Sequence, residues 1–356
     1  KQAWLWIQHF HHRLMNKWRS FTEDGPILLL GRRDQAVLLA YYACLVGNIT
    51  VIPICPVTQS QRIEKIVRRS GTKMAICVEQ DQSLLEGLGV QTMTVCADVS
   101  AVASSSCDDV SVDINVFQEA INPAYILYTS GSTGEPKGVI ISPTALAGYI
   151  QSAHDTYGAQ SVFNMPVFTP LGFDLTQTSL LLPALSGGSC QVFPDELAHQ
   201  PEMIHSILSD KSINAIKCTP SHLAVMLDYA NDAVSPVTFI VGGEGLETAL
   251  VERTLNSFPE GTRVINEYGP TEATVGCCIQ ILDSNTYKLE YVRTKTLTPI
   301  GKPLGDAHLS IRDNWGQPLP LVLVRIRRRQ GRIRPRAGIE NDMTELVVTE
   351  NPEEEE

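Results

Sequence analysis

The chain has 356 residues, of which 43% are apolar and 19% are charged, with a net charge of -11 and a pI near 5.2. This length and apolar content suffice for one large domain or two subdomains with substantial cores. The acidic balance argues against a nucleic-acid-binding surface, which would be basic. No apolar run approaches the roughly 20 residues that a membrane span requires, so we expect no membrane partner.

Cysteine usage predicts a reducing compartment. The nine cysteines are odd in number, scattered, and include no C-x-x-C pair. This pattern is typical of free, mostly buried thiols rather than a disulfide framework or a zinc site, and we expect a cytoplasmic location. The histidines at 9, 11 and 12 lie in an amphipathic stretch (4–18) without carboxylates or cysteines at ligand spacing, which favours a solvated helix face over a metal site.

Apolar periodicity predicts alternating strands and helices in the first third of the chain. We expect strands at 27–30, 49–54, 72–78 and 90–95, a helix at 34–44 ending near Gly47, and a helix after Pro56 that stops at Gly71. The Ser/Asp-rich segment 100–113 is predicted to be a polar loop. This alternation predicts right-handed crossovers in a largely parallel sheet.

The same alternation resumes further along. We expect helices at 143–157, 175–185, 201–209, 221–229 and 247–258, and strands at 162–168, 189–193, 213–218, 237–241 and 263–266. A smaller β element is expected at 299–320. The predicted fold class is α/β, with two α/β layers packed face to face and largely parallel sheets, because the number of strands fits two layers better than one continuous sheet.

Between these two series lies a strand that breaks into a loop with three glycines, several hydroxyls and one lysine, at 124–138. Glycines let backbone N–H groups approach a ligand, hydroxyls donate hydrogen bonds, and Lys137 adds a positive charge, so the loop fits a polyphosphate. A Walker A loop would need Gly-Lys-Ser/Thr entering a helix, whereas here Lys137 lies between Pro136 and Gly138 and a strand follows. A flexible surface hairpin is the remaining alternative.

The run Tyr-Thr-Ser-Gly-Ser-Thr-Gly-x-Pro-Lys-Gly at 128–138 resembles the phosphate-loop signature of the adenylate-forming enzymes. These enzymes include acyl-CoA synthetases, luciferases and the adenylation domains of non-ribosomal peptide synthetases. The resemblance spans about 34–320 and implies the N-terminal core of such an enzyme, with ATP and Mg²⁺ as cofactors. The phosphate-binding positions that it implies are Thr129, Ser130, Gly131, Ser132, Thr133, Gly134 and Lys137.

A second motif, at 266–272, closes a strand and enters a Gly-Pro turn. Ligands of parallel sheets collect beyond the carboxyl ends of strands, where the Thr271 hydroxyl could reach phosphate and Glu272 could hold Mg²⁺. Tyr268 could stack on adenine and Asn266 could bond its edge. A polar β-turn is the alternative, but the segment matches the family's adenine and magnesium motif. Gly243 and Glu244 resemble a further adenine-side segment. The candidate catalytic residues are therefore Lys137, Thr271 and Glu272.

Asp174 stands at a predicted helix start, where an N-cap is its simplest role. In the peptide-synthetase branch of the family, an Asp at this place binds the α-ammonium group of the substrate amino acid. A partly buried carboxylate needs a cationic partner, which an ammonium group provides. The substrates of acyl-CoA synthetases have no amine, so Asp174 favours amino-acid activation.

Matching the pocket positions of the family gives nine candidate substrate-binding residues: Asp174, Leu175, Thr178, Lys217, Ile240, Gly242, Glu267, Val275 and Gly276. The two glycines are expected to leave space. A carboxamide suits the charged pair, because its oxygen accepts from Lys217 and its NH₂ donates to Glu267. The series also resembles that of asparagine-activating domains, so the predicted substrate is L-asparagine. The alternative is that Lys217 and Glu267 pair only with each other.

The resemblance implies attack of an amino-acid carboxylate on the α-phosphorus of ATP. The aminoacyl group would then pass to phosphopantetheine on a carrier protein domain, alongside other synthetase modules. The chain departs from the family in lacking a Thr-Gly-Asp segment and the small C-terminal subdomain. We expect an incomplete core at 1–320, a disordered charged tail at 321–356 of frame-slip or truncation origin, and impaired activity. The alternatives are an acyl-CoA or aryl-acid ligase and a non-catalytic nucleotide-binding remnant.

Overall fold

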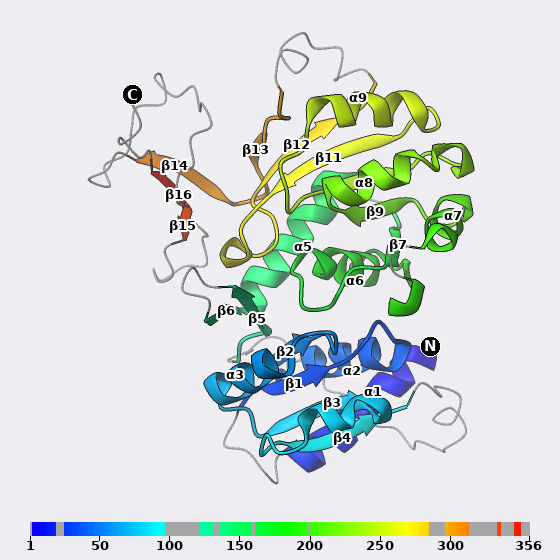
Figure 1. Cartoon of the computed structure of the whole chain (residues 1–356). Coiled ribbons are helices and arrows are strands. Elements are labelled where there is room, and N and C mark those ends of the chain that lie inside the picture. Colours follow the sequence, from blue (N-terminus) through cyan, green and yellow to red (C-terminus); the bar gives the residue numbers. More distant parts are fainter. Residues whose placement is uncertain are drawn as a thin grey trace. The chain divides into compact units, whose positions relative to one another are not determined.

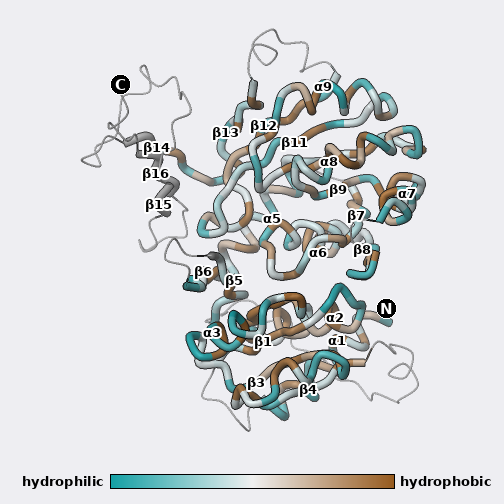
Figure 2. The backbone as a smooth tube through the Cα atoms, in the orientation of Figure 1, coloured by the Kyte–Doolittle hydropathy of each residue, from teal (hydrophilic) through white to brown (hydrophobic). Residues whose placement is uncertain are grey.

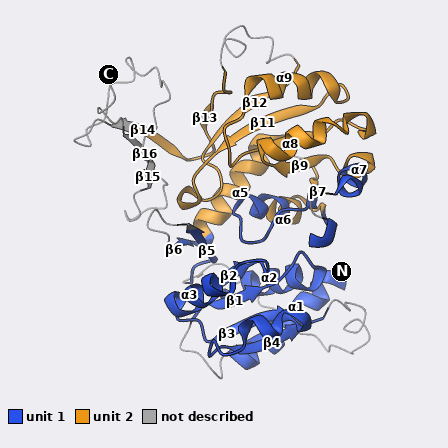
Figure 3. Cartoon of the chain, viewed as in Figure 1, with its two compact units in different colours: residues 1–143, 165–180, 190–207 blue, residues 144–164, 181–189, 208–356 orange. Residues whose placement is uncertain are grey.

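The computed structural model describes residues 2–18, 25–96, 122–130, 135–158, 161–197, 200–284, 296–312, 333–335 and 345–349. The chain divides into two compact units, which Figure 3 shows in different colours. Unit 1 comprises residues 1–143, 165–180 and 190–207, and unit 2 comprises residues 144–164, 181–189 and 208–356. Strands and helices alternate along most of the chain, as predicted (Figure 1).

Unit 1 is built on a six-stranded sheet with the order β4-β3-β1-β2-β5-β6. Its strands are β1 (Ile27–Leu30), β2 (Val51–Ile54), β3 (Met74–Val78), β4 (Gln91–Val95), β5 (Tyr125–Ser130) and β6 (Pro136–Ile141). All pairings are parallel except that of β5 with β6. The central strand β1 is fully buried and wholly apolar, which is typical of a parallel strand covered on both faces (Figure 2).

Two helices of unit 1 each have one end at a residue that the sequence marks. Helix α2 (Gln35–Val46) starts at Asp34, whose Oδ1 accepts from the backbone nitrogen of Ala36 at 2.7 Å. Helix α3 (Ser60–Ser70) stops at Gly71, which has a φ of 67° that favours glycine. Helix α1 (Gln2–Trp18) buries an apolar stripe that includes Phe10 and Leu14. The 3₁₀ helix η1 (Glu79–Leu85) is an addition to the predicted elements.

Unit 2 contains a five-stranded sheet with the order β13-β12-β11-β10-β9. Strands β9 (Ala215–Cys218), β10 (Thr238–Val241) and β11 (Arg263–Tyr268) are parallel, whereas β12 (Cys278–Leu282) and β13 (Lys302–Pro303) extend the sheet in antiparallel fashion. Helices α8 (Pro220–Leu227) and α9 (Thr248–Ser257) follow β9 and β10. Helix α5 (Pro143–Gly158) also belongs to this unit beyond its first residue.

Further elements are β7 (Asn164–Val167), β8 (Ser189–Val192), α6 (Leu175–Ser186), α7 (Pro201–Ser209), and three short 3₁₀ helices, η3 (Asp195–Leu197), η4 (Ala230–Asp232) and η5 (Thr271–Ala273). The predicted α/β class with largely parallel sheets is confirmed. One edge of each of these two sheets nevertheless carries antiparallel pairing, of β6 with β5 and of β12 with β11. Antiparallel neighbours can be joined by a short turn and need no crossover helix. The face-to-face packing of two layers stays a prediction.

The C-terminal segment contains two strands within 321–356 that the sequence analysis does not predict, beside one that falls in the β element expected at 299–320. Strand β16 (Glu345–Thr349) pairs in parallel with β14 (His308–Arg312) and antiparallel with β15 (Ile333–Pro335). For these residues the structure differs from the disordered tail expected at 321–356. The run Leu346-Val347-Val348 has a strong strand propensity, which an interpretation based on the flanking charges overlooks. The rest of that segment lies outside the described residues, as does 100–113.

Candidate active site

In unit 1, the predicted phosphate loop joins two hydrogen-bonded antiparallel strands. Thr129 on β5 lies opposite Lys137 on β6, and the Thr129 hydroxyl is 3.5 Å from the Lys137 carbonyl oxygen, to which it donates. The position of Lys137 is thereby fixed by the strand ladder, and the residue is exposed. The four residues Gly131 to Gly134 lie outside the described part of the chain, as does the side chain of Ser130.

Helix α3 holds the end of this loop. Lys65 Nζ lies 2.7 Å from Glu135 Oε1, and Arg69 Nη1 lies 3.8 Å from Glu135 Oε2. The hydrogen bond from Lys65, followed by its charge, lowers the pKa of Glu135. Arg62 Nη2 also donates to the Tyr128 carbonyl at 3.0 Å. Three cations of one helix therefore lie along the strand and loop end that precede Lys137.

Asp174 precedes helix α6, as predicted. Its Oδ1 accepts from the backbone nitrogen of Leu175 at 2.7 Å, and its side chain is half-buried. Tyr125, the first residue of β5, is fully buried, and its hydroxyl has no hydrogen-bond partner among the described residues. Burial raises the pKa of Tyr125 well above its ordinary range, with contributions from Tyr41 and then from Asp174. The charge of Asp174 therefore contributes to the electrostatic environment of the first residue of β5.

Two further predicted pocket residues of unit 1 lie on α6. Leu175 and Thr178 are both buried, at 8% and 0% exposure. The start of the helix is held by Thr176, whose Oγ1 donates to the Pro170 carbonyl at 2.7 Å. These contacts fix the first turn of α6 and hence the residue that precedes it, Asp174.

In unit 2, the charged pocket residues form a buried ion pair. Lys217 on β9 pairs in register with Ile240 on β10, which pairs with Ile265 on β11, two residues before Glu267. Lys217 Nζ lies 2.5 Å from Glu267 Oε1, and both side chains are only 2% exposed. The pairing that the sequence left open as the alternative to substrate recognition is therefore present in the structure.

The two pocket glycines serve this pair instead of leaving a space. A Cβ on Gly276 would lie 2.5 Å from Glu267 Oε1, and a Cβ on Gly242 would lie 2.8 Å from the Glu267 carbonyl oxygen. The expectation that Gly242 and Gly276 leave space is therefore corrected, because Glu267 fills the volume beside both. Next to them, Val275 has a φ of 67°, which is rare for a β-branched residue.

The second nucleotide motif follows β11. Asn266 Nδ2 donates to the carbonyls of Thr298 and Pro299, at 3.2 and 2.8 Å. Tyr268 is half-buried, and Thr271 and Glu272 lie in η5, both partly exposed. The chain then makes a left-handed turn at Thr274. The described residues contain no group of three or more His, Cys, Asp or Glu side chains that could hold a metal ion.

Gly243 and Glu244 lie just beyond the carboxyl end of β10. Gly243 has a φ of 85°, and both residues are exposed. Glu244 Oε2 accepts from the Ser221 hydroxyl at 2.6 Å. These positions, with those of η5, lie after neighbouring parallel strands, which is where α/β sheets bind ligands.

The structure adds two residues that sequence reasoning missed, Tyr149 and Tyr157 of α5. Both hydroxyls donate to the Glu267 carboxylate, at 3.1 Å from Tyr149 to Oε1 and through a very short contact from Tyr157 to Oε2. The sequence does contain a sign of these two residues, because both tyrosines lie on the buried side of a predicted helix. The hydroxyl group of a buried tyrosine needs a hydrogen-bond partner. In unit 2, Lys217, Gly242 and Gly276 thus lie against Glu267, whereas the predicted residues of unit 1 lie on β5 and β6 and at the start of α6.

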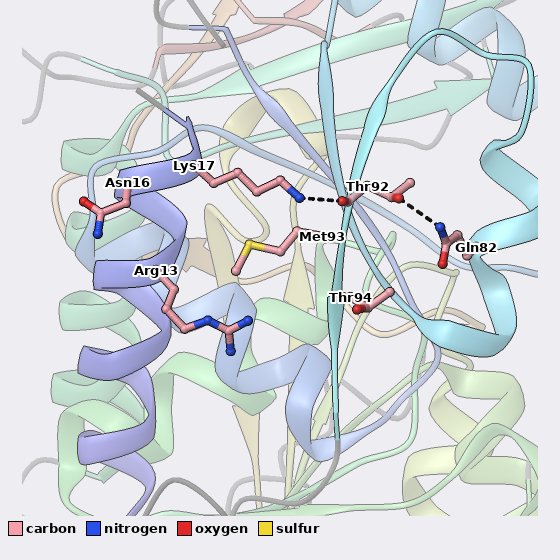
Figure 4. Close-up of a pocket in the computed structure, with 7 residues that line it drawn as sticks. All are labelled: Arg13, Asn16, Lys17, Gln82, Thr92, Met93 and Thr94. Atoms are coloured by element: carbon pink, nitrogen blue, oxygen red, sulfur yellow. Dashed lines mark hydrogen bonds between the residues drawn. The ribbon is translucent and has the colours of Figure 1, made fainter. Parts of the chain in front are cut away.

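A polar cavity of about 600 Å³ lies elsewhere in unit 1, between α1, η1 and β4 (Figure 4). Lys17 and Arg13 line it from the helix, and Lys17 Nζ donates to the Thr92 carbonyl at 2.8 Å. The side chain of Gln82 donates to the Thr92 hydroxyl at 3.2 Å. None of the residues predicted for nucleotide or substrate lines this cavity, so its size alone does not make it the active site.

Comparison with known proteins identifies the family. A family model described as "AMP-binding enzyme" matches residues 20–333. The chain belongs to the AMP-binding enzyme family. This membership confirms the resemblance that the phosphate loop indicates.

Curated members of the AMP-binding family support the same placement. Tyrocidine synthase 3 of Brevibacillus parabrevis is 31% identical over 318 residues, and bacitracin synthase 3 of Bacillus licheniformis is 30% identical over 303 residues. Each match covers 85% of this chain and 4% of the relative. The chain therefore spans a small fraction of the length of these relatives.

Solved structures of AMP-binding enzymes share the fold. The four-domain non-ribosomal peptide synthetase holo-AB3403, bound to AMP and glycine, has a TM-score of 0.71 at 23% identity, covering 89% of this chain and 22% of that one. The N-terminal subdomain of NpsA from Klebsiella oxytoca, in complex with 3-hydroxybenzoyl-AMSN, has a TM-score of 0.71 at 16% identity, covering 88% of this chain and 76% of that one.

No helix of the described residues is both long and apolar enough to cross a membrane.

Proposed function

We propose that this chain activates an amino acid with ATP, forming an aminoacyl-adenylate and releasing pyrophosphate. The observation that carries the proposal is the half-buried Asp174 carboxylate, which is held at the start of α6 by the backbone nitrogen of Leu175 and belongs to the same compact unit as the strands on either side of the phosphate loop. An anionic group in that unit suits a substrate whose carboxylate reacts with phosphorus and whose α-ammonium needs a counterion.

The proposed roles of the residues follow from their positions in the phosphate loop and in the segments that follow β10 and β11. Lys137 and the loop hydroxyls would neutralise the phosphates, Glu272 would hold Mg²⁺, and Thr271 would donate to phosphate. Tyr268, Asn266, Gly243 and Glu244 would surround the adenine. Bound ATP supplies the electrophilic phosphorus, while the protein contributes orientation and charge neutralisation instead of a covalent intermediate. The aminoacyl group would pass to the phosphopantetheine thiol of a carrier domain, since a dimodular nonribosomal peptide synthase of Bacillus subtilis is among the relatives.

The finer proposal is that the amino acid is L-asparagine. Lys217 keeps ammonium protons beyond the one that bonds Glu267, and Glu267 neutralises its charge. A carboxamide oxygen can accept from such a neutralised donor without bringing a charge into the pocket. An aliphatic side chain would leave that donor unsatisfied, at a cost of about 1–3 kcal/mol.

Binding of non-hydrolysable aminoacyl-adenylate analogues to the chain, measured by calorimetry, tests both levels of the proposal. We expect the asparaginyl analogue to bind most tightly, and the Asp174→Ala variant to lose at least about tenfold in affinity, because an α-ammonium group then lacks its counterion. A desamino analogue that binds as tightly as the asparaginyl one would favour an acyl or aryl acid ligase and would refute amino-acid activation.

ATP–pyrophosphate exchange, measured in parallel, separates catalysis from binding. Exchange stimulated by asparagine supports an active ligase. Analogue binding without exchange would support a nucleotide-binding remnant. Preference for an aliphatic or aromatic amino acid in either assay would refute asparagine but leave amino-acid activation in place.

A further inference from the structure

The carboxylate of Glu267 receives hydrogen bonds from three side chains. Lys217 Nζ donates to Oε1 at 2.5 Å, and the Tyr149 hydroxyl lies 3.1 Å from Oε1 and 3.3 Å from Oε2. The Tyr157 hydroxyl donates to Oε2. All four residues belong to unit 2 and are buried, with Tyr157 at 0% and Tyr149 at 6% exposure.

These bonds use most of the acceptor capacity of Glu267. An ionised carboxylate offers about four lone-pair sites. Lys217 takes one, Tyr157 takes one, and Tyr149 is shared between both oxygens. Little remains for an N–H group of a substrate. Lys217 has three ammonium protons, of which the pair with Glu267 uses one. The pair therefore keeps two N–H donors on Lys217 but at most about one acceptor lone pair on Glu267.

Helix α5 is held so that the hydroxyls stay in place. The carbonyl of Tyr157 accepts from Arg263 Nη2 at 2.7 Å, and Arg263 Nη2 also donates to the Thr238 hydroxyl at 3.1 Å. The last turn of α5 is therefore fixed to β10 and β11 through its backbone as well as through the Tyr157 hydroxyl. Burial, followed by the charge of Glu267, raises the pKa of Tyr157 well above its ordinary value, so this hydroxyl stays a donor.

We propose that Tyr149 and Tyr157 are specificity-determining positioning residues, which occupy the acceptor sites of Glu267 so that the pocket offers a hydrogen-bond donor, Lys217. Such a pocket accepts a side chain with an acceptor oxygen and rejects one that ends in an ammonium group. The inference rests on the proposed amino-acid activation and extends it, because it assigns the choice of side chain to two residues of a helix that contributes no residue to the predicted pocket.

The test removes one hydroxyl at a time in the full chain. Tyr149→Phe and Tyr157→Phe each free a lone pair of Glu267 without changing the ring. The probes are non-hydrolysable adenylate analogues of asparagine and of 2,4-diaminobutyrate, with Kd measured by calorimetry. In each variant we expect the preference for asparagine over diaminobutyrate to fall at least tenfold, equivalent to about 1.4 kcal/mol. Tyr42→Phe is the matched control, because the Tyr42 hydroxyl donates to the Leu180 carbonyl at 2.7 Å and both residues belong to unit 1.

An unchanged preference in both folded variants would overturn the inference, as would an equal change in Tyr42→Phe. If the unmodified chain binds neither analogue, the proposed function fails and the specificity role fails with it. A double-mutant cycle of Tyr157→Phe with Glu267→Gln, followed by urea unfolding, still reports on the network separately. A coupling near zero there would show that the Tyr157 hydroxyl does not act through Glu267.

Discussion

Replacing Lys217 with methionine tests the buried ion pair most directly. Lys217→Met keeps the length and most of the volume of the side chain but removes its charge. Glu267 then keeps only the hydroxyl donors Tyr149 and Tyr157. Because both members of the pair are 2% exposed, water cannot solvate the remaining carboxylate without opening the site.

The expected loss follows from that burial. Removing one partner of a buried pair leaves an uncompensated charge and costs about 3–5 kcal/mol of the free energy of unfolding. The two tyrosine hydroxyls keep the loss towards the lower end, since hydrogen bonds to a charged group contribute about 1.5–3 kcal/mol each. The double variant Lys217→Met/Glu267→Gln should recover much of the loss, because no buried charge remains unpaired.

Urea unfolding followed by circular dichroism measures these differences, with the transition of unit 2 fitted separately if the two units unfold apart. The exposed Lys211 is the control, and Lys211→Met should change the free energy of unfolding by no more than about 0.5 kcal/mol. A loss below about 1 kcal/mol in Lys217→Met would refute the argument, as would a double variant less stable than either single one.

Two further predictions concern packing and pH. Gly276→Ala should destabilise by about 1–3 kcal/mol in urea unfolding, because its Cβ would meet the Glu267 carboxylate, whereas Gly148→Ala on α5, with nothing within 4 Å, should be neutral or stabilising. Burial raises the pKa of Cys44 from 9.0 to about 12, so above pH 9 the unfolded chain loses this proton before the folded one and stability falls as pH rises towards 12. Cys44→Ala should remove up to about 1.4 kcal/mol per pH unit of that slope, and an identical slope in urea titrations at pH 9–11 would contradict the assignment.

Local chemistry made much of the fold predictable. Asp34 begins a helix because its carboxylate accepts from the first turn, and Gly71 ends one because its φ is positive. The apolar run at 27–30 could only be a covered strand. What periodicity does not contain is strand direction. The antiparallel pairings of β6 and β12 depend on the length and turn of their connections, and not on the pattern of either strand.

The sequence proposes the residue types of the candidate site but does not contain their pairing. Lys217 and Glu267 lie 50 positions apart, and nothing in their spacing tells whether they face a ligand or each other. The hydrogen bonds from Tyr149 and Tyr157 to Glu267 come from a helix more than 100 positions before Glu267. In the sequence, only the general need of buried hydroxyl groups for hydrogen-bond partners indicates such bonds.

The hydrogen bond from Lys17 to Thr92 has a practical meaning for making shorter versions of this protein. Strand β4 is the outermost strand of its sheet, and that bond occupies a carbonyl on the strand with a cationic side chain. A version trimmed to begin at residue 25 would lose α1 and leave this carbonyl without its lysine. An unprotected edge strand pairs with strands of other chains, so such a version should self-associate. Keeping residues 2–18 is the simplest safeguard against aggregation during expression.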